Sequence, residues 1–162
     1  MVNLLLIWQI FHYLILQTAS KILYIAVSIP NFCHSKYSGF SSGIITGVYG
    51  SQRILNGKPK WPHYGIDIAA NKGTHIKSSA KGIVTMAEDD LYYTGGTIIM
   101  DHGHGISTIY SHLENVLVSV GDKINQGDII GTVGSTGRST GPHLDFRINW
   151  FQTRLDPMTV IN

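Results

Sequence analysis

Short β-branched runs separated by glycine are the feature that most restricts the fold of this chain. Of its 162 residues, 18 are glycine, and most of them follow residue 38. Runs such as GIITGVYG, GTIIMDH and GDIIGTVG lie between these glycines, a pattern typical of short strands joined by tight turns. No stretch after residue 43 repeats apolar residues at the helical spacing. We therefore predict an all-β, antiparallel domain over residues 43–162.

The segment VSVGDKINQGDIIGTVGSTG, residues 118–137, predicts the type of β domain. Its two Gly-Asp pairs mark turns between short strands, as in biotinyl and lipoyl carrier domains and other barrel-sandwich proteins. A carrier would present a lysine in a hairpin turn. Lys123 is the one candidate and lacks the expected flanking methionine, so we interpret the segment as structural. The prediction is a barrel-sandwich-like fold (a duplicated hybrid motif).

Residues 88–96, EDDLYYTGG, are expected to form a polar and aromatic loop. Its acidic residues are then solvated, and the alternative is that Tyr92 and Tyr93 contact a substrate at the rim of a site. The turn DHGHG is expected to leave His102 and His104 exposed.

The first 28 residues differ in character from the rest. No charged side chain precedes Lys21, and the apolar run suits a signal sequence or a membrane anchor. Gln9, His12 and Gln17 interrupt this run, so a helix packed on the domain or an unstructured remnant is the alternative. Residues 29–42 are predicted to be a linker. We expect membrane contact through residues 2–28 and a location in the cell envelope, either periplasmic or membrane-anchored.

Charge content bears on the binding partners of the chain, and cysteine content bears on its compartment. Charged residues make up 14% of the chain, and the net charge is +2. No basic run marks a nucleic-acid surface, so no nucleic-acid partner is expected. The single cysteine, Cys33, cannot form an internal disulfide. Cysteine content therefore does not indicate the cellular compartment of the protein.

Strand parity groups several side chains that can ligate metal. Residues two apart in an extended strand share a face, so His143 and Asp145 point the same way in HLDFRINW. Asp67 lies between two isoleucines in GIDIAA and is expected opposite the apolar layer. His63 is four residues earlier and can return to the side of Asp67. On the strand that ends at His112, alternate residues from Ile106 onward are expected to share its face.

Imidazole and carboxylate groups in this combination suit a hydrolytic zinc site. Such a site holds three protein ligands and leaves one position for water. Zinc lowers the pKa of that water to roughly 7, and a nearby imidazole can transfer protons at neutral pH. Taken singly, each residue also has a structural role open to it, as a turn acceptor, a cap or a surface group.

The motifs in order resemble those of the lysostaphin-type zinc metalloendopeptidases, which cut peptide cross-links in bacterial peptidoglycan. The resemblance covers roughly residues 43–160 and rests on HYGID, YSHL and STGPHLDF. It implies that His63 and Asp67 bind the metal and that His112 transfers protons. It also implies that His143 stands beside the metal's water, polarising it or stabilising the oxyanion.

One position departs from the family pattern. The family's third ligand is the second histidine of His-x-His, and this chain has Asp145 there. Aspartate also binds zinc, and we predict it as the third ligand. A His, Asp, Asp set neutralises a divalent ion, which should acidify the bound water less, and its oxygen-rich character favours harder metals such as manganese.

Two other functions stay open at this stage. Asp145 favours a binding or regulatory module that contacts the cell wall or activates another wall hydrolase. The apolar start of the chain leaves a third interpretation, an unproductive fragment of a longer protein.

Overall fold

The computed structural model describes residues 43–160, which belong to one compact unit. The predicted apolar segment 1–28 and linker 29–42 lie outside the described residues. Within 43–160 the structure consists of strands, turns and one turn of 3-10 helix at Pro157–Thr159. No helix in this range has the length and apolar character needed to cross a membrane.

The twelve strands are β1 (Ile44–Gly47), β2 (Ile54–Leu55), β3 (Lys58–Pro59), β4 (Ile66–Ala69), β5 (His75–Lys77), β6 (Gly82–Leu91), β7 (Gly95–Asp101), β8 (Ile106–Val116), β9 (Lys123–Ile124), β10 (Ile129–Val133), β11 (His143–Trp150) and β12 (Thr153–Leu155). Every pairing between them is antiparallel. The predicted all-β, antiparallel fold is confirmed.

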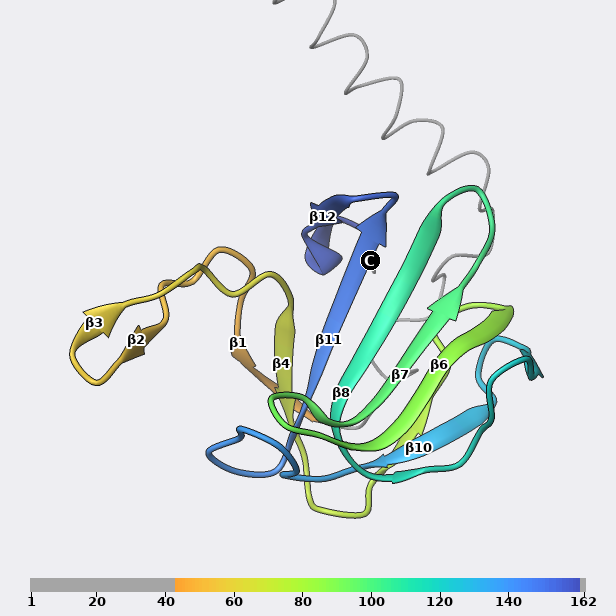
Figure 1. Cartoon of the computed structure of the whole chain (residues 1–162), viewed down its shortest axis with the longest axis horizontal. Coiled ribbons are helices and arrows are strands. Elements are labelled where there is room, and N and C mark those ends of the chain that lie inside the picture. The colour runs from red at the N-terminus through yellow and green to blue at the C-terminus, as the bar shows by residue number, and fades with distance from the viewer. Residues whose placement is uncertain (1–42, 161–162) are drawn as a thin grey trace, which may run out of the picture. The chain divides into compact units, whose positions relative to one another are not determined.

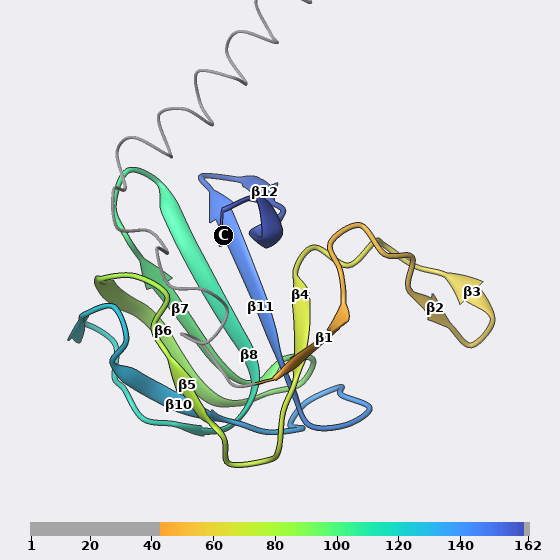
Figure 2. The same cartoon turned by 180° about the vertical axis from the view of Figure 1, so that it is seen from behind.

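The strands form one large sheet and one small hairpin. The large sheet has ten strands, with the central order β1-β4-β11-β8-β7-β6-β9. β10 pairs with both β8 and β5, and β12 pairs with β11. The sheet curls so that β10 and β5 lie across one end of β6, β7 and β8 (Figures 1 and 2). The hairpin of β2 and β3 projects from the edge near β1 and β4 (Figure 1).

The core lies on one face of the central strands. Leu144 and Phe146 of β11 and Ile66 and Ile68 of β4 are all buried. Tyr110 of β8 packs on Phe146 with ring centroids 5.2 Å apart. This apolar layer leaves the intervening residues of β4 and β11 on the opposite face, as parity predicted.

The predicted loop over residues 88–96 is wrong. β6 continues to Leu91, residues 92–94 form the turn, and β7 begins at Gly95. Glu88, Asp89 and Asp90 are exposed although they belong to the strand. Because the last residues of β6 are exposed on both faces of the strand, their polar sequence resembles that of a loop.

The prediction that His112 shares a face with Ile106 and Tyr110 is also wrong. β8 does not end at His112 but runs on to Val116, and His112 has a φ of 65°. The β7–β8 pairing shifts register in the same region. This local bulge re-aims the side chain, so that Ile106 and Tyr110 face the core while the His112 ring contacts that of His143.

The expected exposure of the DHGHG turn holds for His104 but not for His102. The Nδ1 of His102 lies 2.8 Å from the Lys81 carbonyl oxygen, and its Nε2 lies 2.7 Å from the Thr108 hydroxyl. Burial lowers the pKa of His102, although the Lys81 carbonyl partly opposes this.

Candidate metal centre and active site

Two carboxylates face each other at the centre of the candidate site. β4 and β11 pair so that Asp67 lies directly opposite Asp145, and His143 lies opposite Ala69. Both acids are on the face that the core does not use. Like charges directly opposite each other destabilise a sheet. The register of these two strands therefore requires a cation near the pair.

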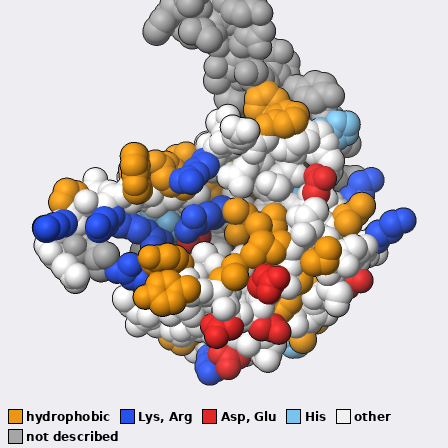
Figure 3. All heavy atoms as spheres, viewed as in Figure 1, with side chains coloured by type: hydrophobic (Ala, Val, Ile, Leu, Met, Phe, Trp, Pro, Cys, Tyr) orange, Lys and Arg blue, Asp and Glu red, His pale blue; other side chains and the backbone are white. Residues whose placement is uncertain are grey.

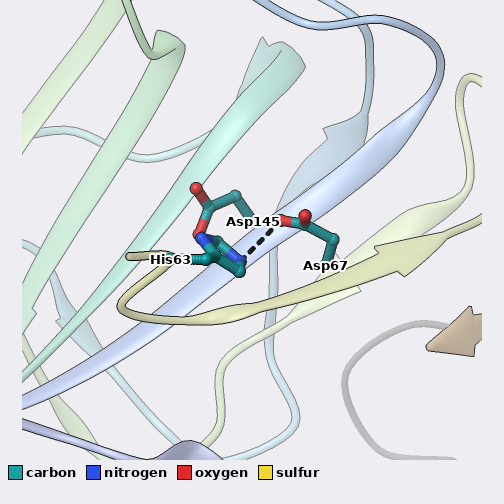
Figure 4. A group of neighbouring side chains, drawn as sticks. All are labelled: His63, Asp67 and Asp145. Carbon is teal, nitrogen blue, oxygen red and sulfur yellow. Dashed lines mark ion pairs between the residues drawn. The ribbon is translucent and has the colours of Figure 1, made fainter. Parts of the chain in front are cut away.

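His63 completes a group of three potential ligands with these acids (Figure 4). It precedes β4, where its N–H donates to the Ser51 carbonyl oxygen at 2.9 Å and its carbonyl oxygen accepts from the Gly50 N–H at 2.8 Å. The His63 Nε2 atom lies 3.0 Å from Asp67 Oδ1. Both atoms are buried, and their mutual geometry is not that of a hydrogen bond.

This group fits a metal ion in ligand type and spacing. One donor atom from each of His63, Asp67 and Asp145 lies within 4.8 Å of the other two. Tetrahedral zinc with bonds of about 2.0–2.1 Å holds its donors about 3.3 Å apart, so small side-chain movements would suffice. The His63 Nε2 and Asp67 Oδ1 atoms are buried without a hydrogen-bond partner, and a metal ion would satisfy both.

Arg147 binds one of the carboxylates of this group. Its Nε and a terminal nitrogen donate to the two oxygens of Asp145, at 3.0 and 2.5 Å. The Asp145 side chain is 1% exposed and that of Arg147 is 28% exposed. Gly65 makes room for the pair, because a Cβ there would lie 2.8 Å from Asp145 Oδ1. The hydrogen bonds that Arg147 donates to Asp145 raise the pKa of the guanidinium.

Arg53 brings a second positive charge to the site. One terminal nitrogen of Arg53 lies 2.6 Å from His63 Nδ1, 3.7 Å from Asp67 Oδ2 and 3.9 Å from Asp145 Oδ2. Burial raises the pKa of Asp67, but His63, His143 and Arg53 together bring it below its ordinary value. The arginines thus supply the cations that the paired acids require.

The position of Arg53 also determines the tautomer of His63. A guanidinium only donates hydrogen bonds, so His63 Nδ1 accepts and its proton resides on Nε2. Ligation through Nε2 needs the opposite tautomer. Arg53 in this position and a metal on His63 Nε2 therefore exclude each other, and the 46% exposed Arg53 side chain has room to move into solvent.

Two further imidazoles border the group. The Nδ1 of His112 lies 2.9 Å from the Thr136 carbonyl oxygen, and that of His143 lies 2.8 Å from the Gly141 carbonyl oxygen. A carbonyl only accepts, so both rings carry their proton on Nδ1 when neutral and offer Nε2. The ring centroids are 4.8 Å apart, and His143 Nε2 lies 3.7 Å from Asp67 Oδ1.

The protonation of His112 follows from its surroundings. Burial lowers its pKa, and the neighbouring His143 adds to this effect. The Thr136 carbonyl and the charges of Asp145 and Asp67 oppose it in part. His112 is therefore neutral at pH 7, with Nε2 able to accept a proton.

All five predicted site residues thus come together, whereas sequence reasoning missed Arg53 and Arg147. Arg147 could have been found, because the parity that groups His143 with Asp145 also includes the next alternate residue. Arg53 had no local signal. It reaches the site because the chain folds back through the β2–β3 hairpin before it arrives at His63.

The part of the chain that carries this site is similar to known peptidases. The model of peptidase family M23 matches residues 61–157. The DD-carboxypeptidase/endopeptidase Mpg of Neisseria meningitidis serogroup B is 39% identical over 98 residues, which is 60% of this chain and 22% of that protein. The matched part therefore spans about a fifth of the length of this curated relative.

Two solved structures are each similar over 72% of the chain. The catalytic domain of lysostaphin from Staphylococcus simulans has a TM-score of 0.63 and 35% identity, covering 72% of this chain and 90% of that one. A zinc-containing peptidase from Vibrio cholerae has a TM-score of 0.66 and 30% identity, covering 72% of this chain and 36% of that one.

Proposed function

The chain belongs to peptidase family M23, and from this premise we propose that it is a zinc-dependent endopeptidase that hydrolyses the peptide cross-links of bacterial peptidoglycan. The observation that carries the proposal is the group of His63, Asp67 and Asp145, whose donor atoms lie within 4.8 Å of one another. A relative from Vibrio cholerae that is named a peptidoglycan DD-endopeptidase supports the substrate class. In this proposal the three residues are the metal ligands.

A zinc ion held there would supply Lewis acidity and a water of lowered pKa. The protein's own part is to position and to move protons. His143, fixed by the Gly141 carbonyl, directs Nε2 toward the side of Asp67 and is assigned to polarise the attacking water or stabilise the oxyanion.

His112 is assigned to proton transfer. Its Nδ1–H donates to the Thr136 carbonyl oxygen, which fixes the ring and leaves Nε2 as the proton-carrying atom. Because burial keeps the ring neutral at pH 7, Nε2 can accept a proton from water and then give it to the leaving amine. General acid–base groups of this kind contribute about 10²–10⁴-fold to the rate.

The ion pair of Arg147 with Asp145 favours a second function. If the bidentate contact persists in the presence of metal, Asp145 is a structural acid and only two protein ligands remain. The chain would then be a binding or regulatory module of the cell wall. For either function we propose a location in the cell envelope, because the substrate is there.

The test measures metal content and hydrolysis on the same full-length preparations. The proposal expects about one zinc per chain and the release of new amino groups from purified peptidoglycan. His112→Ala should keep the metal and lose most of the turnover, and Lys123→Gln, a change in a distant exposed strand, should alter neither. Absence of zinc after exposure to it, together with retained binding to the wall, would favour the regulatory function.

A further inference from the structure

The arginines of this chain are distributed unusually. The chain has four, Arg53, Arg138, Arg147 and Arg154, and all of them line the two cavities beside the candidate metal centre. Most of the lysines lie elsewhere. Arginine binds carboxylates through two parallel hydrogen bonds, which lysine cannot do. Its concentration at one site therefore indicates recognition of carboxylates rather than general solubility.

The two cavities share a wall at the metal centre. The first, about 670 Å³, is lined by His63, Trp61 and Arg154. The second, about 600 Å³, is lined by His112, Asp145 and Arg138. Arg53 and Arg147 border both. A peptide crossing the candidate ligands would thus have one of the remaining arginines on either side.

The two inner arginines already have acidic partners, and the two outer ones do not. Arg53 and Arg147 lie against Asp67 and Asp145. Arg138 is exposed, and Arg154 lies 4.1 Å above the centroid of the Tyr64 ring. Within residues 43–160 no carboxylate lies within 4.0 Å of either outer guanidinium.

The cleft is more positive than the chain as a whole. Lys60 adds a fifth cation to the four arginines along its lining, where Asp145 is the one carboxylate, and Asp67 lies behind this lining, 3.7 Å from Arg53. With both carboxylates counted, the excess is three positive charges where the whole chain has +2. Figure 3 shows Lys and Arg side chains in a band that runs from the β2–β3 hairpin to a hollow with His and acidic atoms inside. Such a cleft attracts anionic ligands.

We infer that this cleft selects anionic peptides, with Arg138 and Arg154 binding free carboxylates on the two sides of the metal centre. The inference rests on the proposed function, because it names the class of peptide which that site would accept. Trp61, 82% exposed, and Tyr64 give the Arg154 side an aromatic surface for the aliphatic part of the same ligand.

The experiment compares one ligand in two charge states. Cross-linked peptidoglycan fragments are used as isolated and after carbodiimide-mediated amidation of their carboxylates. Binding to the zinc-supplemented full chain is measured by calorimetry in a His112→Ala background, which suppresses turnover. Arg138→Gln and Arg154→Gln are compared with Lys123→Gln, which removes the same charge outside the cleft.

The acidic fragment should bind about tenfold more tightly than its amidated form, since hydrogen bonds between charged groups are worth more than neutral ones. Each arginine substitution should reduce this preference and leave binding of the amidated fragment unchanged. Equal binding of the two forms would overturn the inference. So would competition by inorganic phosphate as strong as that by a carboxylate peptide, which would indicate general attraction of anions.

Hydrolysis by the wild-type chain separates this inference from the proposed function. Cleavage of both forms with equal kcat/KM would keep the peptidase function and remove the carboxylate selection. A binding preference for the acidic form without cleavage of either would keep the selection and remove the peptidase function.

Discussion

Arg147→Gln should have opposite effects on the metal-free protein and on its affinity for zinc. Without metal, Arg147 is the bidentate partner of Asp145, which is 1% exposed. Breaking a buried ion pair by removing one partner costs about 3–5 kcal/mol. Arg147 is 28% exposed and Arg53 lies 3.9 Å from the same carboxylate, so we expect a loss below that range, about 2 kcal/mol.

Zinc should reverse most of that loss. The substitution frees both Asp145 oxygens from Arg147 and removes a positive charge beside the metal position. At an effective dielectric constant near 20, unit charges about 5 Å apart interact by about 3 kcal/mol, so zinc should bind at least about tenfold more tightly. Ligand at about 100 times its dissociation constant stabilises the folded state by about 2.7 kcal/mol.

Urea unfolding of the full chain in EDTA and in zinc measures both effects. A double-mutant cycle with Asp145→Asn isolates the pair, and Lys123→Gln controls for charge. If the free energy of unfolding of Arg147→Gln in EDTA lies within about 0.5 kcal/mol of the wild-type value, which is ordinary for a surface change, the ion pair with Asp145 does not stabilise the fold. If zinc binds no more tightly to the variant, Arg147 does not compete with the metal.

Three further predictions concern single residues. Asp145→Ala leaves two protein ligands and should release the metal in elemental analysis; retention of zinc would exclude Asp145 as a ligand. Arg53→Gln should raise the affinity for zinc, measured by chelator competition, because Arg53 excludes metal from His63. The same change should alter the urea midpoint little, because Arg53 is half-exposed. The folded pKa of His102 is lowered, so stability should fall as pH drops below about 6.5, and His102→Gln should flatten urea midpoints measured between about pH 7.5 and pH 5.

Strand parity correctly predicted which side chains share a face in the strands where apolar and polar residues alternate regularly. β4 and β11 bury their isoleucine, leucine and phenylalanine residues on one side, which leaves Asp67, His143 and Asp145 on the other. What parity could not supply is register. The direct opposition of Asp67 to Asp145 depends on how two strands far apart in sequence align, and this opposition creates the need for a cation.

The sequence predicted a role for His112 but not the direction of its side chain, and the reason is local. Its φ of 65° is a conformation that non-glycine residues adopt at a cost of about 1–3 kcal/mol, and no residue pattern marks it. Tertiary contacts hold it, since the His112 N–H donates to the Thr94 carbonyl oxygen and its ring to that of Thr136. Extended geometry would have directed the imidazole toward the core beside Tyr110.

Arg147 changes the electrostatic consequence of having an aspartate at position 145. From the ligands alone, a His, Asp, Asp set cancels the charge of a divalent ion, whereas an imidazole in the third position leaves one positive charge. The Arg147 guanidinium lies within hydrogen-bonding distance of both Asp145 oxygens and returns that charge to the site. Asp145 and Arg147 together therefore carry the net charge of a neutral histidine. Because that charge favours deprotonation of a nearby water and opposes binding of a cation, this pair should preserve the acidity of the water and weaken the hold on the metal.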